Sequence, residues 1–109
     1  MDKERLQETS VLLIAYAGDA YGHFNEAINQ ARAGDFEEAD RELAAGRESI
    51  AEGHKAQIEL LAAEGRGDDL TFSLLLVHAQ DHLMMAMSFE NVARQMIELC
   101  RDRTSGGQS

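Results

Sequence analysis

The stretch Leu74–Met87 reads LLLVHAQDHLMMAM and carries three titratable side chains inside an apolar run. Leu, Met, Ala and Gln favour the helix, and no Gly or Pro interrupts the sequence from there to Leu99. On a helix, the apolar residues of this segment cover nearly the whole circumference. A helix that is apolar on all sides must be buried on all sides. The segment therefore predicts a long helix that has a partner for each of its faces.

The rest of the chain also has the composition of long helices with few interruptions. Proline is absent from the 109 residues, and helix-forming residues dominate. Two breaks, AGD at Ala33–Asp35 and GRGDD at Gly65–Asp69, each pair a Gly that can end a helix with an Asp that can cap the next one. We predict an all-α, antiparallel three-helix bundle, with helices from about Lys3 to Ala33, Phe36 to Glu64 and Leu70 to Arg103.

The chain is short enough to form a single helical domain, which we place at residues 1–103. The tail TSGGQS, residues 104–109, is predicted to be disordered. Each Gly inside a helix costs about 1 kcal/mol relative to Ala. Close approach of a neighbouring helix and local bending both explain such residues, of which the expected helices contain Gly18, Gly22, Gly46 and Gly53.

Two neighbouring helices within one subunit can cover only part of the third helix. The remainder would form an apolar patch larger than monomeric proteins usually expose. We therefore predict self-association through the helix expected at residues 70–103. The alternative is that loops and the tail cover the remaining face.

The charge balance disfavours nucleic-acid binding, although an acidic surface is also an ordinary solubility device. Twenty acidic residues stand against ten basic ones, so the formal net charge is −10. This negative surface repels nucleic-acid phosphates and anionic lipids and suits a basic protein partner.

The N-terminal segment lacks an apolar signal core, and no apolar run is long enough to span a bilayer. The single cysteine, Cys100, cannot form an intramolecular disulfide, and we predict a cytoplasmic protein without direct membrane insertion.

Helical spacing brings His78, Asp81 and His82 to one side of the expected helix. Residues three and four apart lie within about 5 to 6 Å of one another, whereas Gln80 points elsewhere. A carboxylate buried without a partner costs several kcal/mol, so Asp81 needs compensation. A hydrogen bond to histidine, a proton shared with another carboxylate and a metal ion all remain open. For Asp81, the alternative is a satisfied or partly solvated acid, and for His78 and His82 it is that both are ordinary histidines near the surface.

The histidine spacing favours some chemistries over others. HAQDH has the His-x3-His spacing of helical zinc sites, but it lacks the glutamate that follows the first histidine in metallopeptidases. Glycine-rich phosphate loops and nucleophile elbows are absent from the sequence. A neutral imidazole is a nucleophile at about pH 7 and can carry a covalent phosphoryl group. A histidine on a rigid helix, flanked by apolar residues and shared between subunits, meets the needs of such a carrier.

Four segments of the chain resemble the lactose/cellobiose family of enzyme IIA components of the phosphoenolpyruvate-dependent sugar phosphotransferase system. They are AGDA at Ala17–Ala20, EAINQARAGDFEEAD at Glu26–Asp40, GHKAQ at Gly53–Gln57 and, most specifically, LLVHAQDHLM at Leu75–Met84. The resemblance implies a three-helix subunit that assembles as a homotrimer with a nine-helix bundle. The apolar circumference of residues 70–103 agrees with that assembly.

The resemblance also implies roles for the polar residues. His78 would accept a phosphoryl group from the phosphocarrier histidine protein and pass it to a cysteine of enzyme IIB. The membrane component, enzyme IIC, would then be an indirect partner. Asp81 would lie on the three-fold axis and hold one Mg²⁺ per trimer with its two copies. Gln80 and His82 would orient or hydrogen-bond the phosphoryl group, either within a subunit or across a boundary.

The chain departs from the family pattern at a few positions. Ile58 stands where threonine is common, Cys100 where tyrosine is common, and Gly46 and Gly53 where alanine is usual. These positions lie outside the HAQDH motif, so they bear on partner specificity and bundle rigidity more than on phosphoryl transfer.

Two other hypotheses stay open at this point. One is a non-catalytic helical scaffold that is stabilised by a metal bound to His78, Asp81 and His82. The other keeps the fold and makes the protein a regulator whose phosphorylation state is sensed by another protein. The sugar is not set by the sequence, because this subunit is not expected to contact it.

Overall fold

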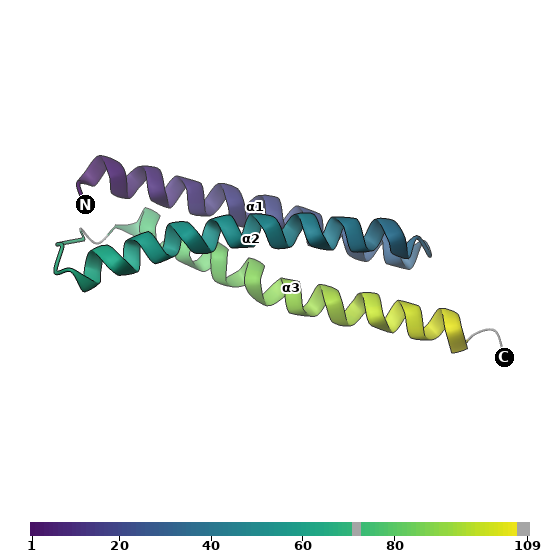
Figure 1. Ribbon diagram of the computed structural model, residues 1–109. Coiled ribbons are helices and arrows are strands. Elements are labelled where there is room, and N and C mark those ends of the chain that lie inside the picture. The colour runs from purple at the N-terminus through teal and green to yellow at the C-terminus, as the bar shows by residue number, and fades with distance from the viewer. Residues whose placement is uncertain (71–72, 107–109) are drawn as a thin grey trace.

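Three long helices make up the protein. The computed structural model describes residues 1–70 and 73–106. Its helices are α1 (Lys3–Arg32), α2 (Phe36–Gly65) and α3 (Leu74–Gly106). They run lengthwise in one elongated bundle of 62 × 19 × 18 Å, with successive helices pointing in opposite directions (Figure 1). The predicted antiparallel three-helix bundle is confirmed.

The two turns contain the helix-ending glycines, and the first also contains the capping aspartate, that the sequence predicted. Gly34 and Gly67 adopt φ angles of 86° and 89°, in the region that favours glycine. Asp35 caps α2, because its Oδ1 accepts a hydrogen bond of 3.1 Å from the backbone N–H of Glu38. At the start of α1, Asp2 accepts from the N–H of Arg5 at 2.7 Å in the same way. The predicted ends of the first two helices are therefore right to within about one residue.

Both predicted ends of α3 need correction. The helix begins at Leu74 and not at Leu70, since the hydroxyl of Ser73 accepts from the N–H of Leu76 at 3.1 Å and caps the first turn. It continues to Gly106, past the expected end at Arg103. Thr104 Oγ1 donates to the Cys100 carbonyl at 3.0 Å within this extra turn. Residues 104–106 are thus helical, and the rest of the tail predicted to be disordered lies outside the described residues.

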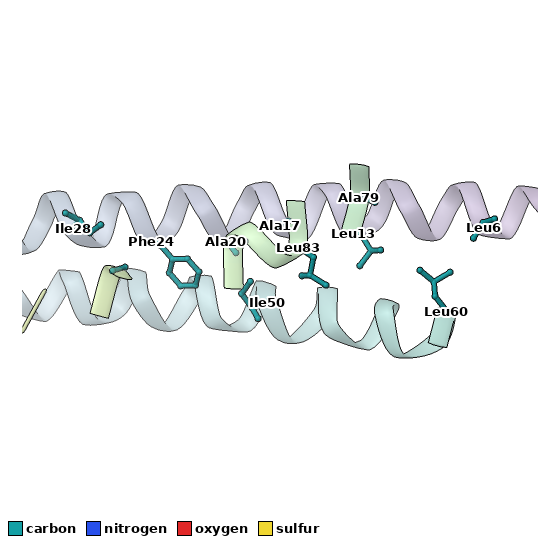
Figure 2. Packing of buried hydrophobic residues seen from close by; sticks show 12 residues of the cluster. Leu6, Leu13, Ala17, Ala20, Phe24, Ile28, Ile50, Leu60, Ala79 and Leu83 are labelled. Atoms are coloured by element: carbon teal, nitrogen blue, oxygen red, sulfur yellow. The ribbon is translucent and has the colours of Figure 1, made fainter. Parts of the chain in front are cut away.

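The hydrophobic core runs along α1, which packs extensively on both other helices, while α2 and α3 contact one another less. Leu13, Phe24 and Leu83 are fully buried at its centre. Small side chains between them let the helix axes approach closely. Figure 2 labels ten members of this core, which are Leu6, Leu13, Ala17, Ala20, Phe24, Ile28, Ile50, Leu60, Ala79 and Leu83. None of the helices in the described part of the chain is both long and apolar enough to cross a membrane.

The glycines inside the helices fall into two classes. A Cβ atom on Gly46 would lie 2.5 Å from Cε1 of Phe24, and one on Gly53 would lie 3.0 Å from Cδ1 of Leu83. These two positions give space to core side chains from other helices, so close helix approach explains them. A Cβ on Gly18 or Gly22 would meet nothing within 4 Å.

Alanine at Gly46 and at Gly18 should have opposite effects on stability. Gly46→Ala is expected to lower the free energy of unfolding by about 1 to 3 kcal/mol, because the new methyl group overlaps the Phe24 ring. Gly18→Ala is expected to raise it by about 0.5 to 1 kcal/mol, because the exposed methyl group costs nothing and alanine favours the helix. Urea unfolding followed by circular dichroism measures both. Equal stabilisation by the two variants would show that Phe24 does not need the Gly46 surface.

A polar cluster joins α1 to α2 away from the core. His23 Nδ1 lies 2.6 Å from Glu42 Oε2, and its Nε2 lies 3.4 Å from Asp19. The hydrogen bond to Glu42 raises the pKa of His23 above its ordinary value, and the charge of Asp19 adds to this effect. The side chain of His23 is 33% exposed. Its contacts give it a structural role in holding two helices together.

Candidate functional site

His78 and His82 form a contacting pair on the surface of α3. They stand one helical turn apart, with His78 exposed and His82 half-buried. Their Nε2 atoms lie 3.1 Å apart, and the rings meet edge to face at a centroid distance of 4.4 Å. In a hydrogen bond at this contact, the Nε2–H of one ring donates to the Nε2 lone pair of the other. The predicted grouping of these two histidines is confirmed.

Asp81 lies on the same side of α3 as His78. The two residues line one shallow groove of about 390 Å³, whose other walls are Leu74, Leu75 and Val77. Asp81 is exposed in the single chain. Its carboxylate therefore needs no partner until another surface covers this groove. The need for compensation that the sequence raised belongs to an assembly and not to the isolated subunit.

Gln80 is held on the other side of Asp81. Its Oε1 accepts a hydrogen bond of 2.7 Å from Nε2 of Gln57 on α2. It also lines a second groove of about 260 Å³ between α2 and α3, together with Leu60 and Leu61. At 100° per residue, His78 is about 60° from Asp81 in one direction and Gln80 about 100° in the other. Within one chain the structure does not bring Gln80 to the histidine pair.

A long apolar surface separates these two edges. Its large side chains follow three- and four-residue steps along α3, as in helices that pack against further helices. They remain exposed in the single chain, with Leu74 at 81% and Leu99 at 59%. We call this surface the open face of α3, and its apolar members are Leu74, Val77, Met84, Met85, Val92, Met96 and Leu99. The described residues of the loops and of the tail leave these side chains exposed, so they do not provide the cover that the alternative to self-association requires.

The described part of a single chain does not form a metal site. Among residues 1–70 and 73–106, no three His, Cys, Asp or Glu side chains are grouped so that they could hold a metal ion. The scaffold hypothesis, in which His78, Asp81 and His82 ligate one metal, therefore lacks its site in the described chain. Asp81 offers a single carboxylate, which fits a cation that prefers oxygen ligands only where further copies add theirs.

Nothing in the sequence indicated that one further residue, Gln57, contacts the site. Gln57 belongs to the segment GHKAQ, but the sequence assigned it no role. Its partner Gln80 is 23 positions further along the chain and on another helix. Within α2, Gln57 has only the signature of a half-buried polar residue, so no local pattern could have revealed the pairing.

Comparison with known proteins places this arrangement in a family. The sequence matches the family described as "PTS system, Lactose/Cellobiose specific IIA subunit" over residues 8–101. The PTS system lactose-specific EIIA component of Staphylococcus aureus is 41% identical over 98 residues, covering 90% of this chain and 95% of that protein. The corresponding protein of Streptococcus mutans is 40% identical over 99 residues, covering 91% of this chain and 95% of its own.

Solved structures agree with the sequence relatives. The crystal structure of the PTS cellobiose-specific enzyme IIA from Bacillus anthracis has a TM-score of 0.91 at 34% identity, covering 96% of this chain and 94% of its own. The IIA(Chitobiose)–HPr complex of the Escherichia coli phosphotransferase system contains a chain with a TM-score of 0.78 at 32% identity, covering 95% and 99%. This chain belongs to the lactose/cellobiose-specific IIA subunit family of the phosphotransferase system.

Proposed function

We propose that this protein works in the cytoplasm and carries a phosphoryl group on His78. The donor is the phosphocarrier histidine protein HPr, and the acceptor is a cysteine of enzyme IIB, through which enzyme IIC is reached. The observation that carries the proposal is the exposed His78 ring at an apolar groove, with its Nε2 3.1 Å from that of His82. The related Escherichia coli IIA was solved in complex with HPr, which supports HPr as the donor.

Each transfer is a displacement at phosphorus. The lone pair of Nε2 of His78 attacks the phosphorus carried by the donor histidine. A new P–N bond forms while the donor's P–N bond breaks, and the donor ring keeps the electron pair. In the second step a thiolate sulfur of enzyme IIB attacks the same phosphorus, and the P–N bond to His78 breaks. Such transfers depend on positioning and charge stabilisation, so a small site suffices.

His82 has a supporting role in this scheme. When the Nε2–H of His82 is the donor of the 3.1 Å contact, His78 carries its own proton on Nδ1, and its Nε2 lone pair becomes free to attack once this hydrogen bond opens. After transfer, the N–H of His82 faces the phosphoryl oxygens, to which it donates a charge-assisted hydrogen bond. The neighbouring ring thus sets the reactive tautomer first and stabilises the product afterwards.

The open face of α3 supports assembly as a homotrimer. Three copies packed about one axis would bury its exposed apolar side chains in a nine-helix bundle. Contacts in a three-fold ring are heterologous, so each boundary joins one edge of the open face to the opposite edge of the next copy. His78 and Gln80 lie on opposite edges. Gln80 of one copy would therefore approach the phosphoryl group on His78 of its neighbour.

Asp81 would lie at the centre of that assembly. Three copies of Asp81 on the axis would repel one another, and a shared Mg²⁺ would offset this repulsion with oxygen ligands. At about 100 times its Kd, a bound ion stabilises the assembly by about 2.7 kcal/mol. Equilibrium dialysis is expected to give one Mg²⁺ per three chains for the wild type and none for Asp81→Asn. Unchanged binding by that variant would remove Asp81 as the ligand.

Phosphoryl labelling tests the proposed function. The protein is incubated with ³²P-phosphoenolpyruvate, enzyme I and HPr, and enzyme IIB is then added. We expect an acid-labile label in the peptide that contains His78, followed by its transfer to a cysteine of enzyme IIB. A protein that takes up no label, or that takes it up on another residue, would disprove the proposal.

A further inference from the structure

The hydrogen bond between Gln57 and Gln80 links α2 to the edge of the open face of α3. Gln57 Nε2 donates to Gln80 Oε1 at 2.7 Å, and both side chains are half-buried. The walls next to Gln80 are largely apolar, including Leu60, Leu61 and Leu76, and the carboxylates of Glu64 and Asp81 also line this groove. In such surroundings an amide that loses its partner is costly, so this bond has a strong effect on the orientation of Gln80.

The direction of this bond decides which half of the Gln80 amide is presented. A glutamine amide has an acceptor oxygen and an NH2 group with two donors, at opposite corners of one plane. Because Gln57 takes the oxygen of Gln80, it turns that oxygen towards α2. The NH2 group is then the half directed away from α2. Phosphoryl oxygens only accept hydrogen bonds, so this orientation is the one that suits a phosphoryl ligand.

We propose that Gln57 is a positioning residue for phosphoryl transfer. It holds the NH2 group of Gln80 towards the phosphoryl group on His78 of the neighbouring copy. This inference rests on the proposed function and on the contact between opposite edges of the open face. Gln57 itself does not touch the reacting atoms. It prevents Gln80 from presenting its carbonyl oxygen, which would repel the transferred group.

The alternative is that this hydrogen bond only holds the two helices together. Reversing the direction of the hydrogen bond distinguishes that structural role from a positioning role. Gln57→Glu keeps the shape of the side chain but replaces the donor by an ionised acceptor. Gln80 must then donate its NH2 group to residue 57 and present its oxygen to the neighbouring copy. A purely structural link survives this reversal, because a hydrogen bond still joins the helices. A positioning role does not survive it.

The experiment measures phosphoryl uptake from phosphorylated HPr by rapid quench on the assembled protein. Gln57→Glu is expected to slow uptake by about tenfold or more, with little change in the KM for HPr. The side-chain amide resonances of Gln80 should shift in ¹H–¹⁵N spectra of the same variant. Gln57→Met, which keeps the length but has no donor, should give a smaller loss because Gln80 can still adopt the productive orientation.

A second background shows whether the effect passes through Gln80. The new carboxylate could also slow transfer by direct repulsion of the phosphoryl group. Gln57→Glu is therefore repeated in Gln80→Leu protein, where a positioning effect is expected to vanish and direct repulsion to persist. An unchanged rate for Gln57→Glu, or an equal loss in both backgrounds, would overturn the inference. Failure of the wild type to take up label would instead refute the proposed function.

Discussion

His78→Ala is expected to abolish phosphoryl uptake from HPr, whereas His82→Ala is expected to slow it and leave it measurable. Alanine at position 78 removes the only nitrogen that forms the P–N bond in the proposed scheme, so no residual chemistry remains. Alanine at position 82 removes the ring whose Nε2 lies 3.1 Å from Nε2 of His78 and which donates to it in the proposed scheme. A hydrogen bond to a charged group contributes about 1.5 to 3 kcal/mol, which corresponds to a rate loss of about 10- to 100-fold.

The His82→Ala substitution also changes the tautomer of His78 and the lifetime of the phosphoryl group. Without His82, the neutral His78 ring can carry its proton on either nitrogen, and only the form with a free Nε2 attacks. The phosphorylated product also loses a donor to its oxygens, so the label on His82→Ala should hydrolyse faster than on the wild type. His82→Gln has an NH2 donor on a flexible side chain, and it is expected to recover part of the lifetime.

Labelling at a fixed time and a chase of the label measure uptake and lifetime separately. His23→Gln serves as a control, since His23 lies on α1 in contact with Asp19 and Glu42 and not with the histidine pair. It is expected to take up label at the wild-type rate. Acid-labile label on His78→Ala would refute the assignment of the carrier. Equal loss in His78→Ala and His82→Ala would mean that the two rings share the role.

The helices and their turns could be predicted because their causes are local. Gly34 and Gly67 adopt the positive φ angles that end a helix, and Asp35 caps the next helix through its own side chain. The pairing of His78 with His82 is also local, since helical geometry fixes a contact between residues four apart. The start of α3 was missed because the Ser73 cap is weaker in sequence than the Asp residues that precede it.

Contacts between helices could not be read from the sequence in the same way. The partner of Gln57 depends on how far α2 is shifted along α3, and this register is set by packing. Gly53 against Leu83 is one contact that fixes it, at a position where a Cβ would lie only 3.0 Å from a leucine methyl. The sequence showed only a glycine inside a predicted helix, Gly53, and a polar residue four positions later, Gln57. Only the folded structure shows that the packing around Gly53 places Gln57 next to Gln80.

Val92→Glu is expected to dissociate the proposed trimer into single chains. Val92 lies on the open face of α3, and its side chain is 46% exposed when the subunit is considered alone. In the trimer the substitution would place three carboxylates near the axis, away from water and without cationic partners. Removing an unpaired charge from water costs several kcal/mol, and the three charges also repel one another. Each trimer would contain three such carboxylates, so the variant should be monomeric at micromolar concentration.

Val11→Glu is the matched control, because Val11 is also a helical valine and is 56% exposed, but it belongs to α1. It faces away from the core residues of α1 and lies outside the open face. Glutamate favours the helix more than valine does, so neither variant should lose helicity. Light scattering should give one chain mass, 12.0 kDa, for Val92→Glu and three times that mass for Val11→Glu and the wild type. If Val92→Glu kept the wild-type mass, the open face of α3 would not be the surface through which the subunits meet, and the approach of Gln80 to a neighbouring His78 would lose its basis.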